Sequence, residues 1–153
     1  MGFGVPAALG AGFFLKDKEI WVIVGDGGFQ MTLQELGTAV QEKSNIKIAI
    51  INNGYLGMVR QWQQMFYNAR YIETPISSPN YQLLAEAYGL PGYRVERQED
   101  ILPAVEKARK HKGPVLIEFV VEQHDMVYPM VPAGADLHQM IRRPHPEFEN
   151  NDA

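Results

Sequence analysis

The sequence contains no cysteine among its 153 residues. Disulfide bonds and catalysis by a thiolate are therefore excluded, and the composition fits a reducing compartment. Histidine is also scarce, and its spacing does not match that of a zinc site. We interpret the histidines as scattered surface residues; they are His111, His124, His138 and His145.

An excess of positive charge is also missing. The 14 Lys and Arg residues face 18 Asp and Glu residues, which gives a formal net charge of −4. Long runs of like charge do not occur, so neither nucleic-acid binding nor a polybasic membrane surface is expected. Small-molecule chemistry remains as the favoured class of function.

A membrane span or signal peptide is not indicated either, although residues 1–16 are largely apolar. This segment lacks a basic start, is too short to cross a bilayer, and contains Pro6 and four glycines. We expect a buried helix here. Because the segment begins on apolar residues without a polar lead-in, we also expect the chain to be part of something larger.

Short runs rich in β-branched residues predict strands that are covered on both faces. The three clear runs are residues 19–24, 46–51 and 115–121. A weaker strand is predicted at 93–96. Between the strands, helical periodicity is present in 31–45, 80–89 and 100–113. This alternation predicts an α/β fold with a parallel sheet and helices on both faces.

Residue types at the helix ends support these assignments. Thr32 and Glu35 have the spacing of a capping box, and Asn80 is a suitable N-cap. We predict one domain over residues 1–153, with a core at 1–122 and a C-terminal arm at 123–153. The last few residues of the arm are expected to be disordered.

Polar motifs follow two of the predicted strands directly. GDGG at 25–28 ends the first strand, and NNG at 52–54 ends the second. If these strands are neighbours, Asp26 and Asn53 reach one point, because ligands of parallel α/β sheets bind at the carboxyl ends of strands. A carboxylate and an amide oxygen suit Mg²⁺ with a phosphate. The alternative is that both motifs are only tight turns.

The spacing of the two motifs adds a family resemblance. Gly25, Asp26 and Gly27 are followed, after twenty-four residues, by Asn52 and Asn53. This pattern resembles the thiamine-diphosphate-binding motif of thiamine-dependent decarboxylases and carboligases. The stretches GMVRQWQ and PMVPAG further resemble the C-terminal catalytic domain of the acetohydroxyacid synthase (acetolactate synthase) family, over residues 1–143. The resemblance implies a thiamine-diphosphate-binding fold.

The resemblance also implies roles for residues of the two motifs. Asp26 and Asn53 would bind Mg²⁺ through side-chain oxygens, and Tyr55 would bind it through its backbone carbonyl. Gly27 and Gly28 would hold the diphosphate through main-chain N–H groups.

Further residues would contact the cofactor and the substrate. Leu56, Gly57 and Met58 would contact thiamine diphosphate, and Met1 matches the bulky residue that keeps the cofactor bent. Trp62, together with Met58, would border the substrate channel. The segment 129–138 would be a C-terminal arm that closes over the site.

The activity implied is the condensation of two pyruvates to 2-acetolactate, or of pyruvate with 2-oxobutyrate, in branched-chain amino-acid biosynthesis. In this family the glutamate that activates the cofactor comes from the N-terminal domain of a partner chain. Four glutamates of this chain do not lie in a motif that matches the activating one: Glu35, Glu86, Glu99 and Glu118. We therefore expect no catalytic residue in this chain and no turnover by the isolated chain.

The resemblance also implies partners and a compartment. FAD would bind only to the full-length enzyme, which would be a homodimer or tetramer with a small regulatory subunit. The location would be cytoplasmic in a bacterium, and a plastid or mitochondrion in a eukaryote.

Three alternatives stay open at this point. The chain could belong to another thiamine-dependent carboligase, decarboxylase or pyruvate oxidase. It could be a flavodoxin-like module that binds a different phosphate ligand. It could also be a non-enzymatic scaffold, since truncated domains can persist as interaction partners. Exposed apolar surface at 1–15 and 126–133 would favour association in any case.

Overall fold

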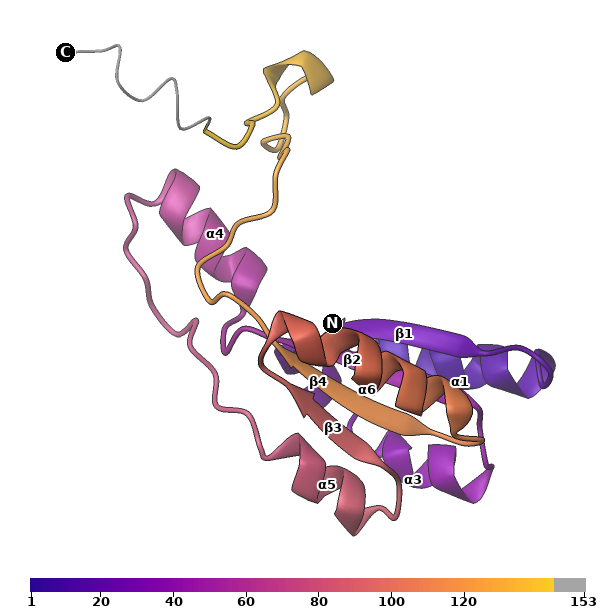
Figure 1. Ribbon diagram of the computed structural model, residues 1–153. Coiled ribbons are helices and arrows are strands. Elements are labelled where there is room, and N and C mark those ends of the chain that lie inside the picture. Colours follow the sequence, from indigo (N-terminus) through magenta and orange to yellow (C-terminus); the bar gives the residue numbers. More distant parts are fainter. Residues whose placement is uncertain (145–153) are drawn as a thin grey trace.

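The computed structural model describes residues 1–144 and contains one parallel sheet (Figure 1). Its strands lie in the order β1-β2-β4-β3. They are β1 (Ile20–Gly25), β2 (Ile46–Asn52), β3 (Gly92–Val95) and β4 (Val115–Val120). Each strand begins and ends within one residue of its predicted position, and the predicted parallel α/β fold is confirmed.

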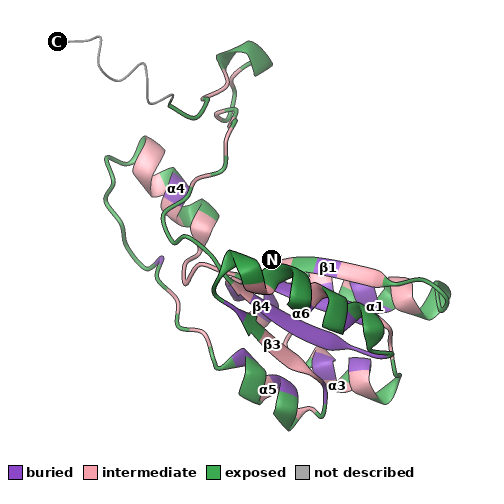
Figure 2. Ribbon diagram, viewed as in Figure 1, coloured by how far each residue is buried: buried purple, intermediate pink, exposed green. Residues whose placement is uncertain are grey.

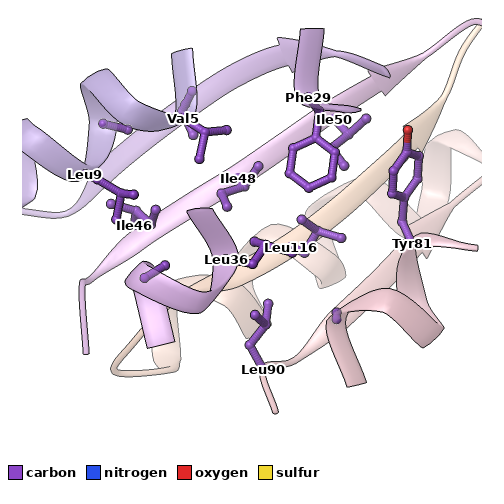
Figure 3. Close-up of a cluster of buried hydrophobic side chains, with 14 residues drawn as sticks. Val5, Leu9, Phe29, Leu36, Ile46, Ile48, Ile50, Tyr81, Leu90 and Leu116 are labelled. Carbon is purple, nitrogen blue, oxygen red and sulfur yellow. The ribbon is translucent and has the colours of Figure 1, made fainter. Parts of the chain in front are cut away.

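Helices cover both faces of the sheet, as predicted. One face packs against α1 (Gly4–Phe14), α2 (Asp26–Gln30), α3 (Glu35–Gln41) and α5 (Tyr81–Ala87). Their apolar side chains form the main core with residues of β2 and β4 (Figure 3). The opposite face packs against α6 (Gln98–Lys110), which buries Ala104 and Ala108 against Val115 and Ile117.

The register of β1 and β2 brings the two polar motifs to the same edge of the sheet. Ile20 pairs with Ile46, and Gly25 pairs with Ile51. Asp26 and Asn52 therefore leave the sheet side by side at its carboxyl edge, because neighbouring strands lie about 4.8 Å apart. The prediction that these strands are neighbours is confirmed.

Of the two helix caps predicted from the sequence, one is present in the structure and the other is not. The Asn80 side chain accepts hydrogen bonds from the N–H groups of Gln82 (3.0 Å) and Leu83 (3.1 Å), which confirms this N-cap. The prediction of a capping box by Thr32 and Glu35 is wrong. Helix α3 begins at Glu35, and the Glu35 carboxylate accepts a hydrogen bond from Thr38 Oγ1 instead.

The predicted helix over 31–45 is also wrong in its extent, because only part of this segment is helical. The helical conformation already begins at Asp26, breaks after Gln30, and resumes at Glu35. The turn between these helices is closed by i→i+3 hydrogen bonds, such as that from Glu35 N to Thr32 O.

The first helix is buried on one side only. Val5, Ala8 and Leu9 of α1 enter the main core, whereas Phe3 and Phe14 are largely exposed. Within residues 1–144, none of the helices combines the length and apolar character that crossing a bilayer requires.

Helix α4 (Gly57–Phe66) and the C-terminal arm extend away from the sheet at its carboxyl edge (Figure 1). The arm leaves β4, passes α4 and includes a short 3₁₀ helix, η1 (Leu137–Gln139). Exposed and half-buried residues dominate this part of the molecule, in contrast to the buried central strands (Figure 2). The disorder predicted for the last residues, and the end of the arm, lie outside the described residues.

Candidate cofactor site

A cavity of about 510 Å³ opens at the carboxyl edge of β1 and β2. It is bounded by the start of α2, the loop after β2, the start of α4, and the first residues of the chain. All nine residues that the sequence predicts as cofactor contacts line this one cavity: Met1, Asp26, Gly27, Gly28, Asn53, Tyr55, Leu56, Gly57 and Met58. The structure thus brings the two motifs together with a segment that lies far from them in sequence.

Asp26 is the only acidic residue among those nine and is nearly buried, with 2% of its surface exposed. Its Oδ2 accepts a hydrogen bond from the backbone N–H of Gly54 at 3.0 Å. Burial raises the pKa of the Asp26 carboxyl above its ordinary value. Hydrogen bonds from the Gly27 and Gly54 N–H groups and the Ser78 hydroxyl oppose part of this shift. A buried carboxylate of this kind is stabilised by a bound cation.

The loop after β2 is held through both backbone polar groups of Gly54. Gly54 N donates to Asp26, and Gly54 O accepts from Ile76 N at 2.9 Å. Gly54 has a φ of +70°, which a residue with a side chain rarely adopts. Leu56 N donates to Thr74 O at 2.8 Å, so the segment 74–76 supports the loop from the other side.

The two asparagines of the NNG motif face different surroundings. Asn53 lines the cavity, and its Oδ1 accepts a hydrogen bond from Tyr55 N at 3.1 Å. Asn52 does not line it. Its Nδ2 donates to Glu118 Oε1 at 2.7 Å, and its Oδ1 accepts from Gly54 N at 3.1 Å.

Gly27 lies where a side chain would be crowded by the ends of two apolar side chains. A Cβ atom at this position would lie 3.0 Å from Leu56 Cδ2 and 3.1 Å from Ile76 Cδ1. At Gly28 it would lie 3.3 Å from Val24 Cγ2. Both glycines line the cavity and carry no side chain, so a ligand can approach the backbone here closely.

These donors fit Mg²⁺ and a diphosphate better than they fit a transition metal. Asp26 and Asn53 offer hard oxygens, which Mg²⁺ prefers, and leave room for phosphate oxygens and water. Within residues 1–144, no group of three or more His, Asp and Glu side chains could hold a metal ion. A cation at this edge would therefore bind Asp26 together with amide and carbonyl oxygens rather than a cluster of acids.

Trp62 lies outside this cavity. It lines a second, more open hollow of about 820 Å³, between α4 and the segment 67–72. Met58 and Val59 line both spaces. Trp62 is partly exposed, and its ring meets that of Phe66 edge to face at 5.4 Å. The two predicted substrate-channel residues, Met58 and Trp62, are thus neighbours in this hollow.

The C-terminal arm reaches the cavity through residues other than those expected. Asp125 and Val127 line it, whereas none of residues 129–138 does. Gln61 of α4, which is 2% exposed, holds Val127 in place. Gln61 and Ser78 belong to this site although no pattern in the sequence indicates them. Glu118, which was also not predicted, is marked in the sequence as a lone charge within an apolar strand.

Comparison with known proteins identifies the family. Residues 1–119 match the family described as "Thiamine pyrophosphate enzyme, C-terminal TPP binding domain". The chain is 51% identical over 141 residues to the acetolactate synthase large subunit of Corynebacterium glutamicum, covering 88% of this chain and 22% of that protein. It is 45% identical over 141 residues to the mitochondrial acetolactate synthase of Schizosaccharomyces pombe. This match covers 92% of this chain and 21% of that protein.

A solved structure agrees with this assignment. The thiamine diphosphate-dependent 4-hydroxybenzoylformate decarboxylase of Rhodococcus jostii RHA1 matches with a TM-score of 0.75 and 31% identity. The match covers 80% of this chain and 23% of that one. The chain thus spans about a quarter of the length of each protein that it resembles. It belongs to the family of C-terminal thiamine pyrophosphate-binding domains of thiamine pyrophosphate enzymes.

Proposed function

We propose that this chain is the cofactor-anchoring domain of an acetolactate synthase catalytic subunit. The observation that supports the proposal most strongly is the single cavity that all nine predicted cofactor contacts line, with buried Asp26 at its base. The identity of 51% to a curated large subunit supports the choice of enzyme. Family membership favours thiamine diphosphate over the flavodoxin-like alternative.

Different residues of the cavity bind the cation and the diphosphate of the cofactor. Asp26 and Asn53 hold Mg²⁺ through side-chain oxygens, and Tyr55 contributes its backbone carbonyl. The N–H groups of Gly27 and Gly28 bind the diphosphate.

The apolar side of the cavity would hold the rest of the cofactor. Leu56, Gly57 and Met58 contact it at the start of α4, and Met1 supports its bent conformation. Asp125 and Val127 of the arm line the same cavity at its exposed side.

When bound, thiamine diphosphate supplies the electron sink for decarboxylation and for carbon–carbon bond formation. The full catalytic subunit would condense two pyruvates to 2-acetolactate, or pyruvate with 2-oxobutyrate, with loss of CO₂. We assign no catalytic acid or base to this chain, so the isolated chain binds cofactor without turnover. The activating glutamate, FAD, a homodimeric or tetrameric assembly and a small regulatory subunit belong to the full enzyme. Its location would be the cytoplasm in a bacterium, and a plastid or mitochondrion in a eukaryote.

Trp62 and Met58 border the route by which the second 2-oxoacid arrives. Their hollow adjoins the cofactor cavity through Met58 and Val59, which supports this assignment. Replacement of Trp62 would change the preference between pyruvate and 2-oxobutyrate as acceptor.

A second candidate is another thiamine-dependent enzyme. The structural similarity to a decarboxylase of 31% identity supports it, because the fold and the cation motif are shared. The full-length protein separates the two candidates: acetolactate formation from pyruvate supports the synthase, whereas aldehyde release alone supports a decarboxylase.

Calorimetric titration of the purified chain with thiamine diphosphate, with and without MgCl₂, tests the cofactor assignment. We expect binding that requires Mg²⁺ and that is lost in Asp26→Ala. Asp125→Ala is the matched control, because Asp125 lines the same cavity but lies on the arm. Magnesium-independent binding of thiamine diphosphate, or of FMN in its place, would contradict the proposal.

A further inference from the structure

We propose that Glu118 is a positioning residue for the cation-binding loop and that it acts through Asn52. The inference rests on the proposed function, since it concerns the same cation site. Glu118 does not line the cavity, so it does not contact the cofactor and is not a catalytic residue.

Glu118 lies in the middle of the sheet and is 1% exposed. It belongs to β4, where it pairs with Ile50 of β2 on one side and with Arg94 of β3 on the other. Arg94 Nη1 donates to both carboxylate oxygens, at 3.0 and 3.1 Å. This contact compensates a charge that would otherwise be costly to bury.

The second partner of Glu118 connects it to the cavity. Asn52 Nδ2 donates to Glu118 Oε1 at 2.7 Å, and Asn52 Oδ1 accepts the N–H of Gly54 at 3.1 Å. The same N–H also lies 3.0 Å from Asp26 Oδ2. A continuous path of hydrogen bonds therefore runs from the buried acid of β4 to the carboxylate that would bind the cation.

The chemistry of a carboxylate explains why an acid suits this position. An ionised carboxylate only accepts hydrogen bonds, so the NH₂ end of the Asn52 amide must face Glu118. The oxygen end of Asn52 then faces Gly54 N–H and fixes the turn that presents Asn53. An apolar residue at position 118 would leave the Asn52 amide free to rotate. Residues that orient metal ligands in this way typically change metal affinity 10–100-fold when they are removed.

The test measures the Mg²⁺ affinity of the purified chain by calorimetry at saturating thiamine diphosphate. We expect Glu118→Leu to weaken Mg²⁺ binding by about 10–100-fold. Glu118→Gln keeps an acceptor oxygen for Asn52 and should therefore bind Mg²⁺ nearly as tightly as the wild type. Rescue by the isosteric variant distinguishes positioning from charge alone.

A loss of fold stability must also be distinguished from a specific loss of Mg²⁺ affinity. Lys47→Met is the matched control, because Lys47 is another fully buried charge of the sheet, near the start of β2 and far from the cavity. It should lower the melting temperature without changing Mg²⁺ affinity. If Glu118→Leu does not fold, Asn52→Ala breaks the same path at its next member and should show the same loss of affinity.

Hydrogen exchange provides a readout without any ligand. The Gly54 amide should exchange faster in Glu118→Leu or Asn52→Ala than in the wild type and in Lys47→Met. Failure of the wild type to bind thiamine diphosphate with Mg²⁺ would contradict the proposed function. Wild-type Mg²⁺ affinity in Glu118→Leu, or unchanged Gly54 exchange in the variants, would overturn the role of Glu118 alone.

Discussion

Gln61 and Val127 are joined by two hydrogen bonds that resemble the pairing of adjacent strands. Gln61 Oε1 accepts from Val127 N at 2.7 Å, and Gln61 Nε2 donates to Val127 O at 3.0 Å. The same Nε2 lies 3.2 Å from Met130 Sδ. One buried side chain of α4 therefore replaces a neighbouring strand for the C-terminal arm, and α4 and the arm form one wall of the cavity.

Gln61→Leu should release the arm from α4. Leucine fills a similar volume but cannot bond to either backbone group of Val127, which is exposed enough for water to replace Gln61. The loss of stability should be only about 1 kcal/mol. Hydrogen exchange at residues 125–130 should accelerate, as measured by mass spectrometry.

Gln64→Leu is the control for this experiment. Gln64 lies on the same helix, but its side chain accepts a hydrogen bond from Arg60 of that helix rather than from the arm. Equal exchange of the arm in both variants would contradict a specific role for Gln61.

Gly27→Ala should weaken binding of thiamine diphosphate with little change in stability. Alanine favours a helix by about 0.5–1 kcal/mol over glycine, but the new methyl group would crowd Ile76 and Leu56, of which Leu56 lines the cavity. We expect an increase in Kd of about tenfold, or about 1.4 kcal/mol. Calorimetry measures the change.

Gly10→Ala is the matched control, because a Cβ atom there meets nothing within 4 Å. It should stabilise the chain by about 0.5–1 kcal/mol without affecting the cofactor. A Gly27→Ala chain that binds like the wild type would contradict close approach of the diphosphate to this backbone.

The sequence was sufficient to predict the strands and the edge at which the cavity lies. Continuous apolar runs define buried parallel strands, and polar motifs that follow two such strands must meet if the strands are neighbours. Pairing in the sheet is a long-range property, however. That β4 lies between β2 and β3, and thus that Glu118 meets both Asn52 and Arg94, depends on contacts that no local pattern specifies.

Local patterns also fail where tertiary contacts override them. Thr32 and Glu35 have the residue types of a capping box, but the helical conformation already begins at Asp26, whose side chain accepts a hydrogen bond from the loop after β2. Gln61 resembles any polar residue of an amphipathic helix. Its burial arises only because the arm, more than sixty residues later, folds back over it.

Lys47→Met should destabilise the fold strongly. Lys47 Nζ donates to Asn45 Oδ1 at 2.9 Å, His111 O at 2.8 Å and Gly113 O at 2.6 Å. Methionine would leave these acceptors without their donor, at a cost of roughly 2–4 kcal/mol. Urea denaturation of the wild type and the variant measures the difference.

The deficit of Lys47→Met should also depend on pH. Burial lowers the pKa of Lys47, with a smaller opposing effect of Glu19. The folded state therefore loses this proton at a lower pH than the unfolded state. The free energy of unfolding of the wild type should then rise, relative to the variant, as the pH increases through the folded-state pKa toward the unfolded value. A deficit that shrinks over this range would contradict the assignment.

Asp26→Asn should stabilise the chain without cofactor and abolish its response to Mg²⁺. Burial raises the pKa of Asp26 in the folded state, so the carboxyl contributes stability below its unfolded pKa and loses it as the pH rises through the folded pKa. At neutral pH without a cation, the buried charge is therefore unfavourable, and the neutral amide removes this cost. A gain of 1 kcal/mol would raise Tm by about 2–4 °C.

Thermal denaturation at neutral pH, with and without Mg²⁺ and thiamine diphosphate, measures both effects of Asp26→Asn. The wild type should gain stability on addition of the ligands, because they bind only the folded state, whereas the variant should not. Asp125→Asn is the control: its carboxylate is exposed and paired with Arg143 at 2.8 Å, so the ligand response should persist. If Asp26→Asn lowers the Tm of the ligand-free chain, the charge at this position serves the fold. If it raises the Tm and removes the ligand response, the sheet edge retains a destabilising carboxylate because the cation requires it.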